Sequence, residues 1–600
     1  MLLARFGDIG SRVVISLALM ALALAGAGSS LAEEGTPASY ITDLSQCQPS
    51  TALSHDLEPG HWRLIPYVSA EGSGTMLAAG SFINAPEITL PLRTEGWHGI
   101  WLGVWNPAFA YDGSPALKVR LSGDAAFRQL HQGGSPDSQE ATFLREVYYG
   151  DADLTGQDLV IGKMNGPLGR SAYLAYVKLV PLPPAKIEQV LKDREQTDTR
   201  NLVATIDGMS YFHYGEYSRP EHVLEQVELY RHSDVGKVLW AVSYGDLTNF
   251  PASVPDARFV GDHNRQRYST DAAANDYARG ERQMYTSLRS FAKSGVMPQQ
   301  IAAEHVHKMG LKFDLMIRLG MLGALGFLDL GDNGFVSKNP EFCQVTADST
   351  VVSKASYAFQ EVQDFSCAII RDALAQVDAD GINLCFVRGP HLLQYEEPVL
   401  SAFQEEHNED ARNVDARDAR LLKTRADIMT RYVRNVRALL DDIGAARGRR
   451  LDLSVWVWPG NQGVWLGGTP FEEGLDVKAW IREGLLDSVI CQEGVDEEYM
   501  TLGKASDCEF VLYTGYRGDK AMSPKTVTQA YGQGVNAFAY WDMDAVQNFE
   551  EPWNWLRRIG HRDEMADWEN RAPKSRLIKL TEIGGINVEK GLADGVYSGG

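Results

Sequence analysis

The feature that most constrains the fold is an alternation of strand-like and helix-like segments that runs from about residue 200 to residue 562. The strand-like segments are short apolar runs bounded by Gly, Pro or Asp, and the segments between them space their apolar residues three or four apart. The strand candidates are 202–207, 237–245, 311–320, 380–388, 451–460, 486–494, 508–516 and 535–544. Repeated βα units form parallel sheets, and eight of them close into a barrel. We therefore predict an α/β fold with a (β/α)8 TIM barrel over residues 200–562.

The N-terminal region has a different pattern. Residues 55–182 hold short strand-like runs separated by Gly, Pro, Asp and Ser, with no helical spacing, and a stiff PLPPAK linker follows at 181–186. This pattern predicts an all-β, sandwich-like domain that precedes the barrel. Its aromatic residues include Trp62, Trp97, Trp101 and Trp105. These tryptophans form either a sugar-stacking face or the sandwich core.

The two ends of the chain carry smaller segments. Residues 1–32 read as a secretory signal peptide, because two arginines precede an apolar run at 13–25 and small residues lead to Ala32. An uncleaved anchor is the alternative, although a membrane span needs about 20 apolar residues. We expect an exported protein, periplasmic or extracellular, with no integral membrane segment after signal cleavage. The C-terminal tail, 565–600, is expected either to add a strand to the sandwich or to fray.

Charge and composition exclude several classes of partner. The chain has 57 Lys and Arg against 79 Asp and Glu, a net charge of −22 that disfavours nucleic acid. We find no phosphate-binding Gly loop, and His305 and His307 lie two residues apart, hence on different faces of a predicted helix. We therefore expect no metal ion and no other cofactor. Six scattered cysteines are either partly paired or buried as free thiols.

A resemblance adds to this pattern. The segments NPEFCQVTADS and SYAFQEVQDFSCAIIRDALAQVDADGINLCFVRGP, within 339–390, together with KMGLKFDLMIRL at 308–319, resemble stretches of bacterial glycosyl-hydrolase-like TIM-barrel proteins. That group is distantly similar to family 10 glycosidases. The resemblance covers about 200–560, and it implies an exported barrel that acts on glycans. One departure stands out, because Asn383 and Cys385 occupy the fourth-strand positions where the family pattern has Glu and Asp.

Candidate catalytic residues follow from the barrel geometry, because TIM barrels carry their sites at the C-terminal ends of the strands. Glycoside cleavage needs one protonated carboxyl group and one ionised carboxylate. Glu493 is the first choice, since it follows an apolar strand where desolvation would raise its pKa. Asp207 and Asp542 are the candidate partners. The alternative for each of the three is a structural carboxylate that caps a helix or pairs with Arg.

Candidate substrate-binding residues come from the same strand ends. Arg318 and Arg388 either hold sugar hydroxyls or an acidic substituent, or lock the barrel rim to acidic neighbours. Asn383 is expected to donate a hydrogen bond to a sugar hydroxyl. The remaining candidates are ring faces on which a sugar stacks, with burial in the core as the alternative: Trp458, Tyr540 and Trp541.

Together these patterns predict a glycoside-hydrolase-like enzyme. Its expected partner is a polysaccharide or the glycan of peptidoglycan, cleaved by two-carboxylate acid/base chemistry. The alternative is a catalytically inactive glycan-binding barrel, because Asn383 and Cys385 replace the family carboxylates. Fold alone does not decide between the two.

Overall fold

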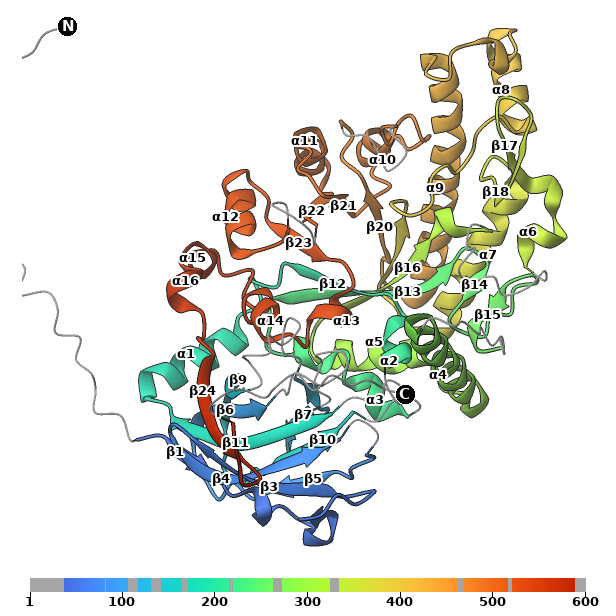
Figure 1. The fold of residues 1–600 in the computed structure, drawn as a ribbon. Helices are drawn as coiled ribbons and strands as arrows, with labels where there is room; N and C mark the ends of the chain where they lie inside the picture. The colour runs from blue at the N-terminus through green and yellow to red at the C-terminus, as the bar shows by residue number, and fades with distance from the viewer. Residues whose placement is uncertain are drawn as a thin grey trace, which may run out of the picture.

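A computed structural model provides the fold of the chain, with a β-rich N-terminal part next to a barrel surrounded by helices (Figure 1). It describes residues 37–80, 83–105, 117–130, 142–164, 171–214, 217, 219–262, 272–323, 334–461, 468–515 and 521–588. The predicted signal peptide lies outside these ranges. Within them, none of the helices has the length and apolar character needed to cross a membrane.

The barrel is built from eight parallel strands, which confirms the predicted (β/α)8 architecture. In chain order they are β12 (Leu202–Ile206), β13 (Val235–Tyr244), β16 (Lys312–Arg318), β19 (Gly381–Cys385), β20 (Asp452–Val457), β21 (Ser488–Gln492), β22 (Glu509–Tyr513) and β23 (Ala537–Tyr540). Each strand pairs in parallel with the next, and β23 pairs with β12 to close the barrel. Each of the eight predicted segments contains one of these strands.

Helices surround the barrel because their apolar stripes face its strands. They are α2 (Ser210–Tyr214), α3 (Pro220–Leu224), α4 (Ala272–Ser294), α5 (Pro298–Lys308), α6 (Phe335–Lys338), α7 (Gln360–Gln376), α8 (Glu397–His407), α9 (Ala419–Arg447), α10 (Val477–Arg482), α11 (Glu497–Ser506), α12 (Pro524–Gly532), α13 (Met543–Val546), α14 (Glu550–Leu556), α15 (Arg562–Ala566) and α16 (Trp568–Arg571). In α7, for example, Val362, Phe365 and Ile369 are buried at helical spacing. Short strands β14 (Leu247–Thr248), β15 (Arg258–Phe259), β17 (Cys343–Val345) and β18 (Val351–Ala355) lie in the loops.

The N-terminal part consists of two sheets that share one buried core. The larger sheet contains β1 (Ser39–Ile41), β2 (Leu53–Ser54), β3 (Trp62–Ser69), β4 (Gly72–Ala79), β6 (Trp97–Trp105), β9 (Phe143–Asp153), β11 (Ala172–Pro181), β24 (Arg576–Ile583) and β25 (Ile586–Asn587). The smaller sheet contains β5 (Ile88–Leu90), β7 (Leu117–Leu121), β8 (Arg128–Gln129) and β10 (Leu159–Lys163). Leu102 and Val177 of the larger sheet pack with Val119 and Ile161 of the smaller one. Helix α1 (Pro184–Glu195) then leads to the barrel.

The structure separates the four N-terminal tryptophans into buried and partly exposed residues. Trp62 and Trp105 are buried, at 0% and 5% exposure, so they belong to the cores of this region. Trp97 and Trp101 stay partly exposed on β6. A single stacking face made of all four rings is therefore absent.

The C-terminal tail joins the N-terminal sheet. Strand β24 pairs antiparallel with β9, where Arg576 faces Glu146, and with β3, where Leu580 faces Ser69. Its inward side chains Ile578 and Leu580 are buried. Of the two alternatives for the tail, the added strand is the one observed, and residues 589–600 lie outside the described ranges.

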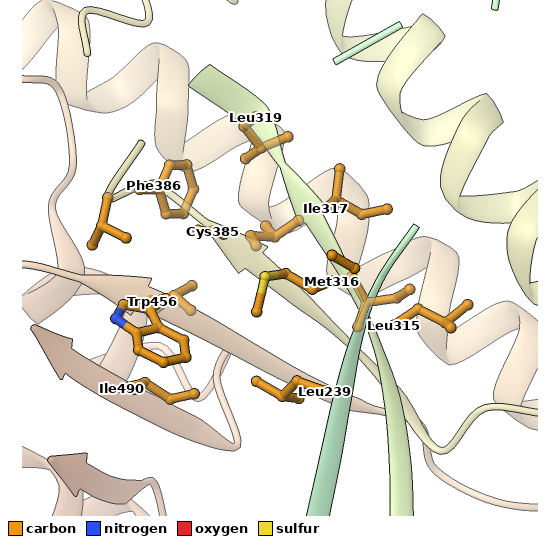
Figure 2. Close-up of a cluster of buried hydrophobic side chains, with 14 of the residues drawn as sticks. Leu239, Leu315, Met316, Ile317, Leu319, Cys385, Phe386, Trp456 and Ile490 are labelled. Carbon is orange, nitrogen blue, oxygen red and sulfur yellow. The ribbon is translucent and has the colours of Figure 1, made fainter. Parts of the chain in front are cut away.

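The barrel interior is packed with side chains from several strands. Figure 2 shows Met316 of β16, Cys385 of β19, Trp456 of β20 and Ile490 of β21 close together in this core. All six cysteines of the chain are free thiols, and five of them are buried. Burial raises the pKa of the Cys385 thiol to about 11. Cys385 therefore fills the interior as a neutral, apolar group.

Candidate active site

Asp207 and Asp542 meet where the barrel closes. Asp207 directly follows β12, Asp542 follows β23 by two residues, and these strands pair with Ala204 opposite Tyr540. Thr205 fixes the junction, because its hydroxyl donates to the Tyr540 carbonyl at 2.9 Å and accepts from the Asp542 backbone N–H at 2.8 Å. The first and last strands of the barrel thereby bring together two carboxylates that lie 335 positions apart in the chain.

The surroundings of Asp542 favour its protonated form. Burial raises the pKa of this carboxyl group to about 6, and the negative charge of Asp207 contributes to the increase. Arg318 and Arg388 act in the opposite direction and keep the pKa from rising further. A carboxyl group with a pKa near 6 is partly protonated close to neutral pH, as a general acid must be.

A third carboxyl group, Asp544, lies in the same cluster. Both of its carboxyl oxygens are shielded from solvent, with no hydrogen-bond partner among the described residues. Burial and the charges of Asp207 and Asp542 raise its pKa well above the usual range. Sequence reasoning placed Asp544 at a strand end and did not select it, although a carboxylate two residues beyond Asp542 was the available signal.

Asp207 also has a structural role. Its Oδ1 accepts hydrogen bonds from the backbone N–H groups of Met209 at 2.8 Å and Ser210 at 2.7 Å, and its Oδ2 accepts from the Ser210 hydroxyl at 2.5 Å. The Tyr244 hydroxyl donates to the Asp207 backbone carbonyl. Asp207 is thus held at the start of α2, in the manner of a helix-capping carboxylate.

Two arginines lie against the ring of Trp541, the residue next to Asp542. The guanidinium of Arg318 lies 5.0 Å from the Trp541 ring and 4.7 Å from that of Tyr244, and the guanidinium of Arg388 lies 5.2 Å from Trp541. Within the described part of the chain, neither arginine forms an ion pair. Both are therefore held by ring stacking, which leaves their positive charge available to the carboxylates and to a ligand.

Glu493 lies at the end of a strand that is two positions from β23 around the barrel. It follows β21, which is separated from β23 by β22, and its backbone N–H donates to the Tyr513 carbonyl at 2.5 Å. Its Oε1 accepts a hydrogen bond from Gln492 Nε2 at 3.1 Å, and Gln492 Oε1 accepts from Trp456 Nε1 at 2.7 Å. A catalytic role for Glu493 stays a prediction.

Three of the predicted sugar contacts lie below the rim. Asn383 is 0% exposed, Trp541 5% and Tyr540 7%. The Asn383 amide donates to Ser454 Oγ at 2.8 Å, inside the barrel, and so its donor has a protein partner. These positions favour a supporting role over contact with substrate, and direct contact stays a prediction. Trp458, by contrast, is partly exposed at the rim.

No arrangement for a metal ion is found in the described ranges, where no group of three or more His, Cys, Asp and Glu is placed to hold one. The two neighbouring histidines of α5 point to separate carboxylates. His305 pairs with Glu228, and His307 pairs with Asp380 at 2.9 Å. Both imidazoles therefore have carboxylate hydrogen-bond partners.

Comparison with known proteins gives only distant likenesses. No known protein family matches the sequence, and neither does any curated protein. One similar solved structure is the α-L-fucosidase isoenzyme 2 from Paenibacillus thiaminolyticus, with 12% identity and a TM-score of 0.37, covering 62% of this chain and 49% of that one. Another is the PgaB (BpsB) glycoside hydrolase domain from Bordetella bronchiseptica, with 11% identity and a TM-score of 0.38, covering 60% of this chain and 98% of that one.

A third is the GH20 exo-β-N-acetylglucosaminidase from Vibrio harveyi, with 9% identity and a TM-score of 0.31, covering 57% of this chain and 43% of that one. The match therefore spans less than half of the length of both the fucosidase and the Vibrio enzyme. At such identities and TM-scores these likenesses assign neither a family nor a function, and no relation to family 10 is shown.

Proposed function

We propose that this protein is an exported, glycoside-hydrolase-like enzyme that acts on a polysaccharide or a cell-wall glycan. The observation that supports it best is the carboxyl group of Asp542, partly buried beside Asp207 and Asp544 at the C-terminal end of the barrel, with a pKa raised to about 6. Glycoside cleavage requires such a protonated carboxyl group together with an ionised one.

In this proposal Asp542 is the general acid. It donates its proton to the glycosidic oxygen as the bond to the leaving sugar breaks. Asp207 keeps the proton on Asp542 near neutral pH, because two negative charges side by side are unfavourable. Asp207 accepts three hydrogen bonds from Met209 and Ser210, at the start of α2, and these bonds make its carboxylate a weak nucleophile. Its main effect is therefore on Asp542.

The second catalytic carboxylate in this proposal is Glu493. It is partly exposed just after β21, two strands from Asp542 around the barrel. An ionised carboxylate at this place would act on the sugar carbon, either directly or through a water molecule, while Asp542 protonates the leaving oxygen. Arg388 and Trp458 are the proposed contacts to the glycan at the rim.

The replaced fourth-strand positions do not remove this chemistry. Asn383 and Cys385 lie buried on β19, whereas the proposed acid comes from the end of β23 and its neighbour from the end of β12. The carboxyl cluster therefore favours hydrolysis over a purely binding barrel. A carboxyl group whose pKa is raised by a neighbouring carboxylate is more typical of a catalytic site than of a purely binding one.

A substrate screen tests the proposal. The purified protein is incubated with plant-type polysaccharides, bacterial exopolysaccharides and peptidoglycan strands, and released reducing ends are measured between pH 5 and 7. We expect release from one class of glycan. Retention of a glycan in a pull-down, without release of reducing ends from any of the glycans, would favour the inactive glycan-binding barrel over the hydrolase.

Export is tested separately. The full-length chain is expressed in a Gram-negative host, and the N-terminus of the protein recovered from the periplasm or medium is sequenced. A mature N-terminus at Glu33 is expected from the residues around Ala32. Recovery of the uncleaved chain in the membrane fraction would identify residues 1–32 as an anchor.

A further inference from the structure

A cavity of about 520 Å³ lies between the N-terminal sheet, helix α1 and the barrel. The sheet contributes Trp101 of β6 and Tyr148 of β9, and α1 contributes Arg194. The barrel side contributes His232, just before β13, and Arg557, just after α14. Because His232 precedes β13, the cavity is at the N-terminal end of the barrel, whereas the carboxyl cluster lies beyond the C-terminal ends of the strands.

Several arginines line the cavity, and two of them, Arg194 and Arg557, have no carboxylate ion-pair partner among the described residues. Arg194 donates to the backbone carbonyl of Asp151 at 2.7 Å and lies 4.9 Å from the Trp97 ring. Arg557 lies 5.9 Å from the Tyr148 ring, and its Nε is buried with no acceptor among the described residues. In the described ranges neither Arg194 nor Arg557 forms an ion pair.

Three of the acidic groups around the cavity, Asp193, Asp234 and Glu564, already have partners. Asp193 forms an ion pair with Arg558 at 3.1 Å, and Arg558 also forms one with Glu564 at 2.5 Å. Asp234 accepts hydrogen bonds from the Gly560 N–H at 2.7 Å and from His561 Nδ1 at 2.9 Å. These carboxylates therefore do not neutralise Arg194 and Arg557. Asp151 also lines the cavity and its negative charge acts on Arg194, although no ion pair joins the two in the described ranges.

The guanidinium groups of the cavity act on His232. Burial and the charges of Arg194 and Arg231 lower the pKa of His232 to about 4, so its imidazole is neutral at physiological pH. The whole chain has a net charge of −22, which makes a concentration of unpaired guanidinium groups unusual for this protein. An anionic ligand would offset their charge.

The cavity also offers aromatic surface. The rings of Trp101 and Tyr148 lie 5.0 Å apart with an angle of 53° between their planes, and Trp568 lines the same space. Aromatic rings next to arginines suit a sugar ring that carries a negative group, because the ring packs against the aromatic face and the anion receives guanidinium N–H donors. A volume of several hundred Å³ is in the range of small-ligand sites.

We propose that this cavity binds a sugar with an anionic substituent, held by Arg194 and Arg557 against Trp101 and Tyr148. The substituent is either the carboxylate of a uronic acid or a sulfate ester. Both are anions that accept hydrogen bonds from guanidinium groups. The inference goes beyond the proposed hydrolase, because binding at this end of the barrel needs no cleavage at the other end.

Calorimetric titration of the full-length protein tests the inference. The probes are trigalacturonate, a sulfated trisaccharide and neutral maltotriose. We expect at least one anionic probe to bind about tenfold or more tightly than maltotriose, with the affinity lost in Arg194→Gln and in Arg557→Gln. Arg434→Gln removes an exposed guanidinium of α9 that pairs with Glu483, and it serves as the matched control with unchanged affinity.

Two further measurements keep the test decisive. Arg194→Lys retains a charge, so it is expected to keep part of the affinity, and unfolding curves show whether each variant is folded. Arg388→Gln removes an arginine of the opposite end. Loss of binding in Arg388→Gln with retention in Arg194→Gln would place the anion at the barrel mouth and overturn the inference, as would equal affinity for all three probes.

Discussion

Asp542 and Asp207 stand at the ends of two neighbouring barrel strands, and the charge of Asp207 adds to burial in raising the Asp542 pKa to about 6. The pairing exists because β23 is the last strand of the barrel and β12 the first, so that closure puts their C-terminal ends side by side. Barrel closure thereby turns an ordinary aspartate into a group able to donate a proton near neutral pH.

The first prediction concerns the pH dependence of hydrolysis. Asp542 must be protonated to act as an acid, so the rate should fall as pH rises through about 6. Well above that value, kcat/KM should drop about tenfold per pH unit. Initial rates on the cleaved polysaccharide between pH 4.5 and 8.5 measure this limb. A rate that stays constant from pH 5 to pH 8 would argue against Asp542 as the acid.

The second prediction concerns Arg388. Its positive charge lowers the pKa of Asp542, and so Arg388→Gln should raise that pKa and move the alkaline limb to higher pH. The same pH series, recorded for the variant, measures the shift. Arg434→Gln, on the outer face of α9, is the control that should leave the limb in place. A shift of the alkaline limb to lower pH in Arg388→Gln would contradict the assignment of Asp542 as the general acid.

The third prediction links the Asp542 pKa to stability. The folded protein binds this proton more tightly than the unfolded chain, whose Asp pKa is about 3.9. Ionising Asp542 therefore lowers stability as pH rises from about 4 to about 6, and this loss is complete above the folded pKa. Asp542→Asn should be more stable than the wild type at pH 7.5, by about 1 to 2 kcal/mol, and show no such gain at pH 4.

Urea unfolding at the two pH values measures this difference. Asp563→Asn alters a carboxylate whose side chain is 73% exposed, and it should change stability little at either pH. A variant that loses stability at pH 7.5 would mean that the Asp542 carboxylate is stabilising in its ionised form.

The fourth prediction concerns the strand formed by the C-terminal tail. Leu580 is 0% exposed where β24 pairs with β3, whereas Leu577 on the same strand is 51% exposed. Leu580→Ala should lower the free energy of unfolding by about 2 to 4 kcal/mol, because it leaves a cavity in a buried contact. Leu577→Ala should change it by about 0.5 kcal/mol or less. Equal effects in thermal unfolding would show that β24 contributes no packed core.

The barrel could be predicted from the sequence because its strands carry strong local signals. The buried run LVATI of β12 is apolar and β-branched, and the intervening helices space their apolar residues regularly. The eight strand positions and the place of Asp207 and Asp542 at strand ends follow from these patterns. Their proximity follows from the count of eight, which makes the first and last strands neighbours.

Other features depend on contacts that no local pattern encodes. Tyr540 and Trp541 read equally well as exposed rings or as core, and their burial is decided by packing against Tyr513 and Trp456, at centroid distances of 6.3 and 4.7 Å. The capping of α2 by Asp207 and the pairing of β24 with β3 likewise depend on tertiary structure. For this reason sequence reasoning identified the strand ends, but its ranking of Glu493 ahead of Asp207 and Asp542 rested on the apolar residues before Glu493 and not on the tertiary environment of each group.

The most direct test of the account is the turnover of Asp542→Asn on the glycan that the wild type cleaves, measured as released reducing ends at pH 5.5. Asparagine keeps the size of the side chain and has no proton to donate. We predict that kcat falls about 10² to 10⁴-fold, with Asp563→Asn unchanged. Turnover of Asp542→Asn within about twofold of the wild type, with the same pH profile, would show that the carboxyl pair at the closure of the barrel does not carry the chemistry.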